Sequence, residues 1–351
     1  KGKKADLMFV QHMLAVLKAD GRLATVMPHG VLFRGGEERE ARKHFIDSGT
    51  LEAVIGLPGN LFYGTGIPAC ILVLNKAGAV QRDHVLFINA DREYREGKAQ
   101  NHLRAEDIDK IVNAYRAGHD VPAYARRVPV TEIRAEDYNC NIRRYVDNAP
   151  PPEPHDVRAH LHGGVPVAEV DALAHYWANY PGLRESCFTV RPAPVAGQPT
   201  YADFAPALQT QRAIADHVAQ HPGVQRCQAQ FMAQLDTWWQ THLPIVEALA
   251  PDATNQHATD RNVYAVRATL LAGLERTFCG EPDAKSASSA HQNLLTRYQI
   301  RGAFANFYQA LASDLKSIAA SGWGPELIPD DDILQSQFPQ VLAELEAQHA
   351  R

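Results

Sequence analysis

Cysteine and long apolar runs are both scarce in this sequence of 351 residues. Its five cysteines are scattered, with no C-x-x-C pair, and lie at positions 70, 140, 187, 227 and 279. An odd, dispersed set argues against a disulfide scaffold or a zinc site and predicts reduced thiols in a cytoplasmic protein. No apolar stretch approaches the roughly 20 residues of a membrane helix, and no signal peptide follows the basic start.

Several other site types are missing as well. The 16 histidines are dispersed along the chain, so we place no metal ion. Neither a nucleophile elbow nor a P-loop is present. There is no initiator methionine, and the first apolar helix begins almost at once. We therefore expect the chain to be a piece of a longer protein.

Charge is divided unevenly. Residues 1–150 contain 22 lysines and arginines against 19 acidic residues, a net charge of +3, whereas residues 151–351 contain 13 against 21, a net charge of −8. The first part is therefore able to face a polyanion. The second part is a poor candidate for a broad phosphate-binding surface.

The first part of the chain alternates between helical and strand patterns. Apolar residues at helical spacing predict a helix over residues 5–18, and charged helices are expected near 36–48 and 105–118. Short apolar runs bounded by Pro, Gly or Asn predict four strands, at 22–27, 51–57, 69–74 and 84–89. This order predicts an α/β fold, a partial Rossmann-like sheet with an antiparallel edge.

The second part is predicted to be α-helical. We expect the first domain at 1–146, a linker rich in Pro and Gly at 147–166, and a helical domain at 167–351. Apolar residues recur at helical spacing near 167–180, 203–220, 224–249, 260–278, 288–319 and 331–349. The adjacent Trp238 and Trp239 point about 100° apart on a helix, which favours core packing over a base-stacking platform.

Two further motifs, one rich in glycine and one basic, could in principle bind phosphate groups. Gly64-Thr65-Gly66-Ile67-Pro68-Ala69 matches a dinucleotide-binding pattern, but a strand follows where a helix is needed, which indicates a turn. A basic segment contains five arginines among three acidic residues, a net charge of +2, and both DNA phosphate contact and plain surface remain open for it. These arginines are Arg126, Arg127, Arg134, Arg143 and Arg144.

The order of motifs in the first ninety residues is the most specific signal. It comprises the helix around Leu7, the run Asp20-Gly21-Arg22-Leu23-Ala24-Thr25-Val26-Met27-Pro28-His29-Gly30, and the run Leu51-Glu52-Ala53-Val54-Ile55-Gly56-Leu57-Pro58-Gly59-Asn60-Leu61-Phe62-Tyr63-Gly64 with the strand after it. This set resembles the N6-adenine DNA methyltransferase family, specifically the modification (M) subunit of type I restriction-modification systems. The resemblance covers residues 5–90 and extends more loosely to about 146. It corresponds to the C-terminal portion of such a subunit.

The resemblance implies a function and its site. Such enzymes flip an adenine out of DNA and methylate its N6 atom with S-adenosylmethionine, working with specificity and restriction subunits. The aromatic residue that stacks on the flipped base then falls on Phe62, with Tyr63 as the fallback; packing beneath the loop is the alternative role for Phe62. Pro28, His29 and Gly30 would line the cleft at a strand end.

Two expected motifs are absent from the chain. The family's glycine-rich cofactor loop and its Asn/Asp-Pro-Pro-aromatic loop are missing, and the nearest approach, Asn148-Ala149-Pro150-Pro151, belongs to the linker. We therefore assign no catalytic residue and expect the chain alone to be inactive. Two other interpretations stay open, a non-enzymatic protein-interaction module of a DNA-processing complex and half of a nucleotide-binding oxidoreductase.

Overall fold

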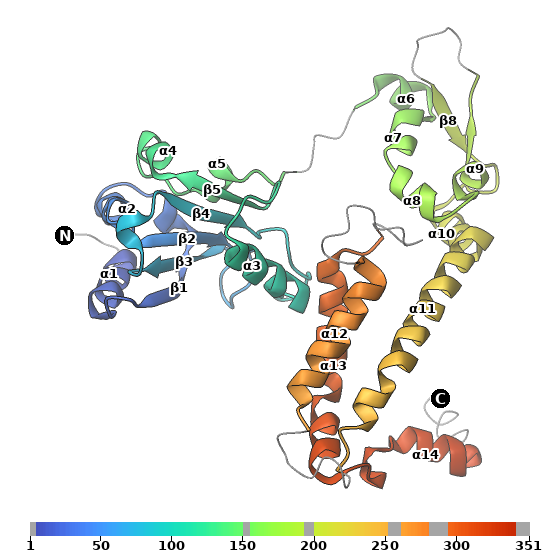
Figure 1. The fold of residues 1–351 in the computed structure, drawn as a ribbon. Helices are drawn as coiled ribbons and strands as arrows, with labels where there is room; N and C mark the ends of the chain where they lie inside the picture. Colours follow the sequence, from blue (N-terminus) through green and yellow to red (C-terminus); the bar gives the residue numbers. More distant parts are fainter. Residues whose placement is uncertain (1–4, 150–154, 193–199, 252–260, 281–293, 342–351) are drawn as a thin grey trace. The chain divides into compact units, whose positions relative to one another are not determined.

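The chain divides into two compact units, Lys1–Pro154 and His155–Arg351. The computed structural model describes residues 5–149, 155–192, 200–251, 261–280 and 294–341 (Figure 1). The predicted helix over 331–349 and the predicted linker therefore lie partly outside the described residues. The predicted order of an α/β sheet followed by a helical region is confirmed.

Unit 1 is built on one five-stranded sheet. In chain order the strands are β1 (Arg22–Pro28), β2 (Leu51–Gly56), β3 (Ala69–Asn75), β4 (His84–Asn89) and β5 (Ala125–Pro129). Their order in space is β1-β3-β2-β4-β5, with β2 and β4 parallel and every other pair antiparallel. All four predicted strands are present, and β5 supplies the antiparallel edge. The antiparallel β3 was not expected inside the sheet, between β1 and β2.

Helices cover both faces of this sheet (Figure 1). They are α1 (Asp6–Val16), α2 (Glu37–Asp47), α3 (Ala105–Ala117), α4 (Val130–Ala135) and α5 (Ile142–Tyr145). One core joins the buried faces of α1, α2, α4 and α5 to Val54, Leu72 and Phe87 of the sheet. A second core places Ile111 and Ala114 of α3 on the opposite face.

The β1 strand is less covered than its neighbours. On the face shared with α3, Ala24 and Val26 are exposed, whereas Met27 on the other face is buried. The outward side of α1 is also apolar, because Phe9 and Val16 are exposed while Leu7 and Val10 pack into the core. This end of unit 1 therefore presents apolar strand and helix surface to its surroundings.

Unit 2 is mostly helical but contains a small sheet. Its first part comprises α6 (Val157–His162), β6 (Val165–Pro166), α7 (Val167–Asp171), α8 (Ala174–Asn179), α9 (Leu183–Cys187), β7 (Phe188–Val190) and β8 (Tyr201–Phe204). The three strands pair antiparallel in the order β6-β8-β7. The prediction of helix almost throughout was wrong here, because strands of two to four residues are too short to show a period.

The rest of unit 2 is a set of long helices. These are α10 (Gln211–Gln220), α11 (Pro222–Glu247), α12 (Val263–Cys279), α13 (Arg297–Ser321) and the shorter α14 (Asp330–Gln337). Trp238 is buried among α11, α12 and α13, and its Nε1 donates to the Leu270 carbonyl at 3.2 Å, so the predicted core role is confirmed. No helix in the described residues is long and apolar enough to cross a membrane.

Candidate functional site

The carboxyl ends of β1, β2 and β4 meet at one end of the unit 1 sheet. These three strands run in the same direction, since β1 and β2 both lie antiparallel to β3 and β2 lies parallel to β4. Their last residues, Pro28, Gly56 and Asn89, therefore lie along one edge. Open α/β sheets bind their ligands outside such an edge.

The turn after β1 brings the predicted cleft residues to this edge. Residues His29–Leu32 form a single 3-10 turn, and the His29 N–H donates to the Pro68 carbonyl at 3.1 Å, which ties the turn to the start of β3. Burial lowers the pKa of His29, and the guanidinium of Arg143 lowers it further, against the opposing effect of the Asp91 carboxylate. The imidazole is therefore neutral at neutral pH, and it is able both to donate and to accept hydrogen bonds.

Arg143 is held beside His29 by a carboxylate at the end of β4. Its Nε and Nη2 donate to Asp91 Oδ2 at 3.0 and 2.8 Å, and Asn148 Nδ2 donates to the other oxygen of Asp91 at 2.6 Å. The Asp91 side chain is only 15% exposed, whereas that of Arg143 is 67% exposed. The buried carboxylate therefore orients the guanidinium toward solvent at the mouth of the site.

The loop between β2 and β3 rises from the same edge with an anchored base. Asn101 donates through its side-chain amide to the Gly59 carbonyl at 3.0 Å and through its backbone to Asn60 at 2.7 Å. The tip is left outside this network: Phe62 is 44% exposed and Tyr63 87% exposed, and an isolated bridge joins Phe62 to Thr65. The loop-tip aromatics are thus exposed on a loop whose base is fixed at this edge of the sheet.

The other four predicted arginines lie elsewhere in unit 1. Three of them form ion pairs with carboxylates, Arg126 with Glu132, Arg134 with Asp47 and Arg144 with Glu136. The structure therefore brings only Arg143, of the five, next to His29. Neither Asp91 nor the buried Asn89, whose Nδ2 donates to the Val146 carbonyl at 3.0 Å, was singled out from the sequence. The polar residues that follow a buried strand at its carboxyl end were the available signal.

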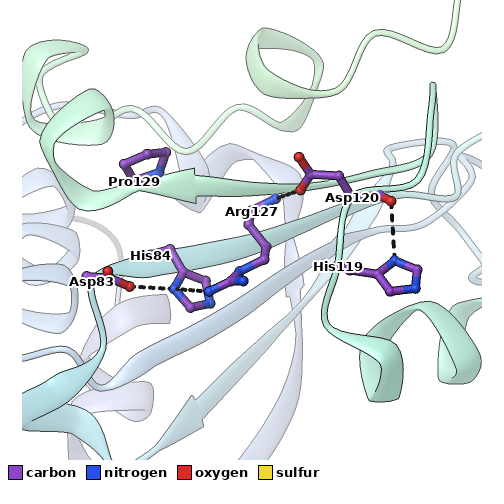
Figure 2. Close-up of a pocket in the computed structure, with 6 residues that line it drawn as sticks. All are labelled: Asp83, His84, His119, Asp120, Arg127 and Pro129. Atoms are coloured by element: carbon purple, nitrogen blue, oxygen red, sulfur yellow. Dashed lines mark hydrogen bonds and ion pairs between the residues drawn. The ribbon is translucent and has the colours of Figure 1, made fainter.

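Arg127 lies in a separate pocket of about 370 Å³ (Figure 2). Its Nη2 lies 3.0 Å from His84 Nδ1, which is itself 2.6 Å from Asp83 Oδ1, and its backbone N–H donates to Asp120 Oδ1 at 2.7 Å. His84 begins β4 and Asn89 ends it, so this pocket lies toward the opposite end of that strand. Two carboxylates here offset the positive charge of Arg127.

None of the described residues form a group of three His, Cys, Asp or Glu side chains able to hold a metal ion. His217 and His221 lie four residues apart, but His217 Nε2 is bonded to Ser186 Oγ at 2.9 Å and His221 Nδ1 accepts from the Gly223 N–H at 3.1 Å. Both imidazoles therefore serve the local structure of unit 2.

Comparison with known proteins identifies the class that this sheet resembles. Residues 1–153 match the family described as N-6 DNA Methylase. The predicted resemblance is thereby confirmed over residues 1–153, which are all of unit 1 except its last residue. Unit 1 is accordingly similar to part of such a methylase.

The particular relatives are subunits of type I restriction systems. The type I restriction enzyme MjaVII methylase subunit of Methanocaldococcus jannaschii is 37% identical over 163 residues, which cover 45% of this chain and 28% of that protein. The MpnII methylase subunit of Mycoplasma pneumoniae is 36% identical over 159 residues, covering 45% and 29%. The solved type I restriction-modification methyltransferase subunit from Streptococcus thermophilus is 43% identical, covering 41% of this chain and 31% of that one, with a TM-score of 0.39. The chain thus spans less than a third of each relative's length.

Proposed function

We propose that the chain is the C-terminal portion of a type I modification subunit, which as an intact protein methylates adenine N6 in DNA with S-adenosylmethionine. The match of residues 1–153 to the N-6 DNA Methylase family carries this proposal. The site adds support, because an exposed aromatic loop and a neutral histidine stand at the ligand-binding edge of an α/β sheet. The three relatives named above are methylase or methyltransferase subunits, which favours the enzyme over an interaction module.

Within this proposal, the cofactor is bound by parts of the intact protein other than the residues described here. The residues described here do not fit S-adenosylmethionine, because the glycine turn around Gly64 and Gly66 leads into β3 and not into a helix, and no Asn/Asp-Pro-Pro-aromatic loop is present. The exposed apolar face of β1 at Val26 and the outward side of α1 at Phe9 supply surface that such parts would cover. We assign no methyl-transfer step to the residues of this chain.

Its own contribution is the target-base side of the cleft. A flipped adenine leaves the base stack at a cost of a few kcal/mol, and a stacking aromatic offsets part of that cost. Phe62 suits this role because its ring stands half exposed on an anchored loop, with Tyr63 as the second candidate. His29 is placed to bond an uncharged base edge, and Pro28 and Gly30 flank it at the strand end.

The test compares the intact subunit with the chain of 351 residues. Intact protein, assembled with its specificity subunit, should transfer a labelled methyl group from S-adenosylmethionine to adenine N6 in duplex DNA. The chain of 351 residues alone should neither bind the cofactor with comparable affinity nor methylate DNA. Methylation of cytosine, or no methylation by the complete assembly, contradicts the proposed activity. Cofactor binding by the chain of 351 residues contradicts only the proposal that other parts of the intact protein bind the cofactor.

Arg143 is the proposed phosphate contact among the five arginines. Its Nη1 has no hydrogen-bond partner among the residues that the structure describes. Its partner Asp91 is the least exposed of the carboxylates that form ion pairs with these arginines. We expect Arg143→Gln to weaken duplex binding about fivefold at moderate salt and to lower the salt-dependence slope by about one. The measurement is fluorescence anisotropy over a salt series.

Arg144→Gln is the matched control for this variant. Arg144 is the next residue in the chain and pairs with the half-exposed Glu136, so its removal should leave the slope nearly unchanged. Equal slopes for the two variants would show that Arg143 makes no particular phosphate contact.

The partners are proposed to include DNA and the specificity and restriction subunits. Unit 2 is the candidate surface for a specificity subunit, because Met232 on α11 and Phe307 on α13 are exposed on long helices. Phe307 also lines an apolar pocket of about 350 Å³ with Trp239 and Leu235. Exposed apolar side chains of this kind are typical of protein interfaces.

A further inference from the structure

A concave cluster of basic side chains lies in the small-sheet part of unit 2. Arg158, His162 and Arg191 line a pocket of about 360 Å³ together with Tyr201 and Thr200. Arg158 and His162 come from α6, and Arg191 follows directly after β7. None of the residues that line the pocket is acidic, although Arg191 is paired with Asp203.

Arg158 is oriented without an ion pair. Its Cζ lies 5.5 Å from the ring centroid of Tyr201, whose hydroxyl donates to Asp156 Oδ2 at 2.9 Å. The other oxygen of Asp156 caps α6 by accepting the Ala159 N–H at 2.9 Å. No carboxylate among the described residues forms an ion pair with Arg158, but Asp156 lies near enough to interact with its charge, and the guanidinium lies over the Tyr201 ring.

Arg191 supplies a second guanidinium in a fixed position. It donates to Asp203 in a bidentate pair, 2.7 Å from Nε and 2.5 Å from Nη2, and through Nη1 to the Gly163 carbonyl at 3.0 Å. A side chain at Gly164, whose φ is +95°, would meet this guanidinium at 3.0 Å. Glycine at this position therefore lets Arg191 pack against the turn after α6.

The architecture around the pocket is a small mixed module. It comprises a helix and a short strand, three further short helices and an antiparallel hairpin, with the sheet order β6-β8-β7. One architecture serves many functions, so the assignment depends on the chemistry of the pocket. Two guanidiniums and an imidazole converging on one cavity match the oxygens of a phosphodiester.

We propose that Arg158, His162 and Arg191 form a phosphate-binding site of unit 2 for the backbone of duplex DNA. This inference rests on the proposed function, since it takes the DNA of the methylation reaction as the source of the phosphate. The site adds affinity that is independent of base sequence. It therefore acts on DNA binding and leaves the chemical step alone.

The test uses the intact subunit and the substitution Arg158→Gln. We expect duplex affinity to fall about fivefold at moderate salt, equally for target and non-target DNA, and the slope of log affinity against log salt to fall by about one. In methylation assays the KM for DNA should rise while kcat stays unchanged. Arg158→Lys, which keeps the charge but loses the planar fork, should keep most of the slope.

Arg212→Gln is the matched control, because Arg212 is an exposed arginine on α10 of the same unit. It should change neither affinity nor slope, and a thermal melt of each variant checks its folding. Equal effects of Arg158→Gln and Arg212→Gln, or an unchanged slope, overturn the inference. The inference is also overturned if Arg158→Gln loses binding of inorganic phosphate but keeps its affinity for duplex DNA, because free phosphate would then be the ligand. Failure of the unsubstituted subunit to methylate DNA counts against the proposed function instead.

Discussion

Replacing Phe62 with alanine is expected to lower kcat/KM for DNA methylation by the intact subunit by about fivefold to 150-fold. The range corresponds to the roughly 1–3 kcal/mol that a base gains by stacking on an aromatic side chain. The loop supports this expectation because its base is bonded to Asn101 and Gln100, while the Phe62 ring is 44% exposed. A ring that only packed beneath the loop would be expected to be more buried.

Stability measurements separate stacking from packing. A half-exposed side chain contributes little to the core, so Phe62→Ala should reduce the free energy of unfolding by about 1 kcal/mol or less. Tyr63→Ala is the companion variant, since Tyr63 is the alternative stacking residue and is 87% exposed. If Tyr63→Ala produces the larger loss of activity, the roles of the two residues are exchanged.

A mismatched target base also distinguishes base stacking by Phe62 from packing of its ring. An adenine that is already unpaired is easier to extrude, so the Phe62→Ala defect should shrink on a mismatched duplex. A variant that loses thermal stability but keeps full activity at a permissive temperature would instead place Phe62 in the core of the loop.

Replacing Arg42 with methionine is expected to destabilise unit 1 by about 2–4 kcal/mol. Arg42 is 5% exposed, and its guanidinium donates to the Val31 carbonyl at 2.8 Å and the Tyr138 carbonyl at 2.9 Å. Burial lowers the pKa of this guanidinium, but it remains charged. Its loss leaves two carbonyls without their hydrogen-bond donor and removes a positive charge near Glu38, whose own ion-pair partner is Arg34 at 3.6 Å.

The two segments that Arg42 joins explain the expected size of the effect. Val31 belongs to the His29 turn, and Tyr138 follows Asp137 in a turn where both residues have positive φ, 53° for Asp137 and 56° for Tyr138. Non-glycine residues persist in that region only when their surroundings hold them. Arg42 therefore fixes the turn at the candidate site to a strained turn on the same face of the sheet.

Arg39→Met provides the matched control from the same helix. Arg39 pairs with Asp137 and Glu40 at the surface, where solvent screens an ion pair and its contribution to stability is small. Hydrogen exchange of the sheet amides reports on unit 1. Tryptophan fluorescence reports on unit 2 alone, because Trp177, Trp238, Trp239 and Trp323 all lie there. Equal destabilisation by both variants would exclude a special role for the buried arginine.

Much of unit 1 was predictable because its central strands are buried on both faces. Ala53 to Ile55 and Ala69 to Leu74 form continuous apolar runs, which is the pattern of such strands. β5 was missed because Arg126 and Arg127 interrupt its apolar residues, and at the sheet edge Arg126 turns to Glu132 instead of into a core. An edge strand tolerates charge that a central strand does not.

The candidate site was only partly predictable. Pro28 and His29 were found because they end an apolar run, and Phe62 was found through the family resemblance. The bond between Arg143 and Asp91 joins residues 52 positions apart, and no local pattern encodes such a pairing. The same holds for the pair of Arg134 with Asp47, which lie 87 positions apart. Arg126 and Arg144 instead pair with Glu132 and Glu136 of the same segment, which reduces the free positive charge of the basic stretch.

The internal position of β3 has a consequence for how unit 1 folds. β1 and β2 do not pair with each other; each pairs with β3, which is the last of the three to leave the ribosome. Until residue 75 has been synthesised, the apolar segments of β1 and β2 lack the strand with which both pair. The register joins residues of β1 to residues of β3 that lie 41 to 53 positions further along the chain, and contacts so distant in sequence slow folding. During that interval the newly made chain is most exposed to aggregation and to chaperone binding.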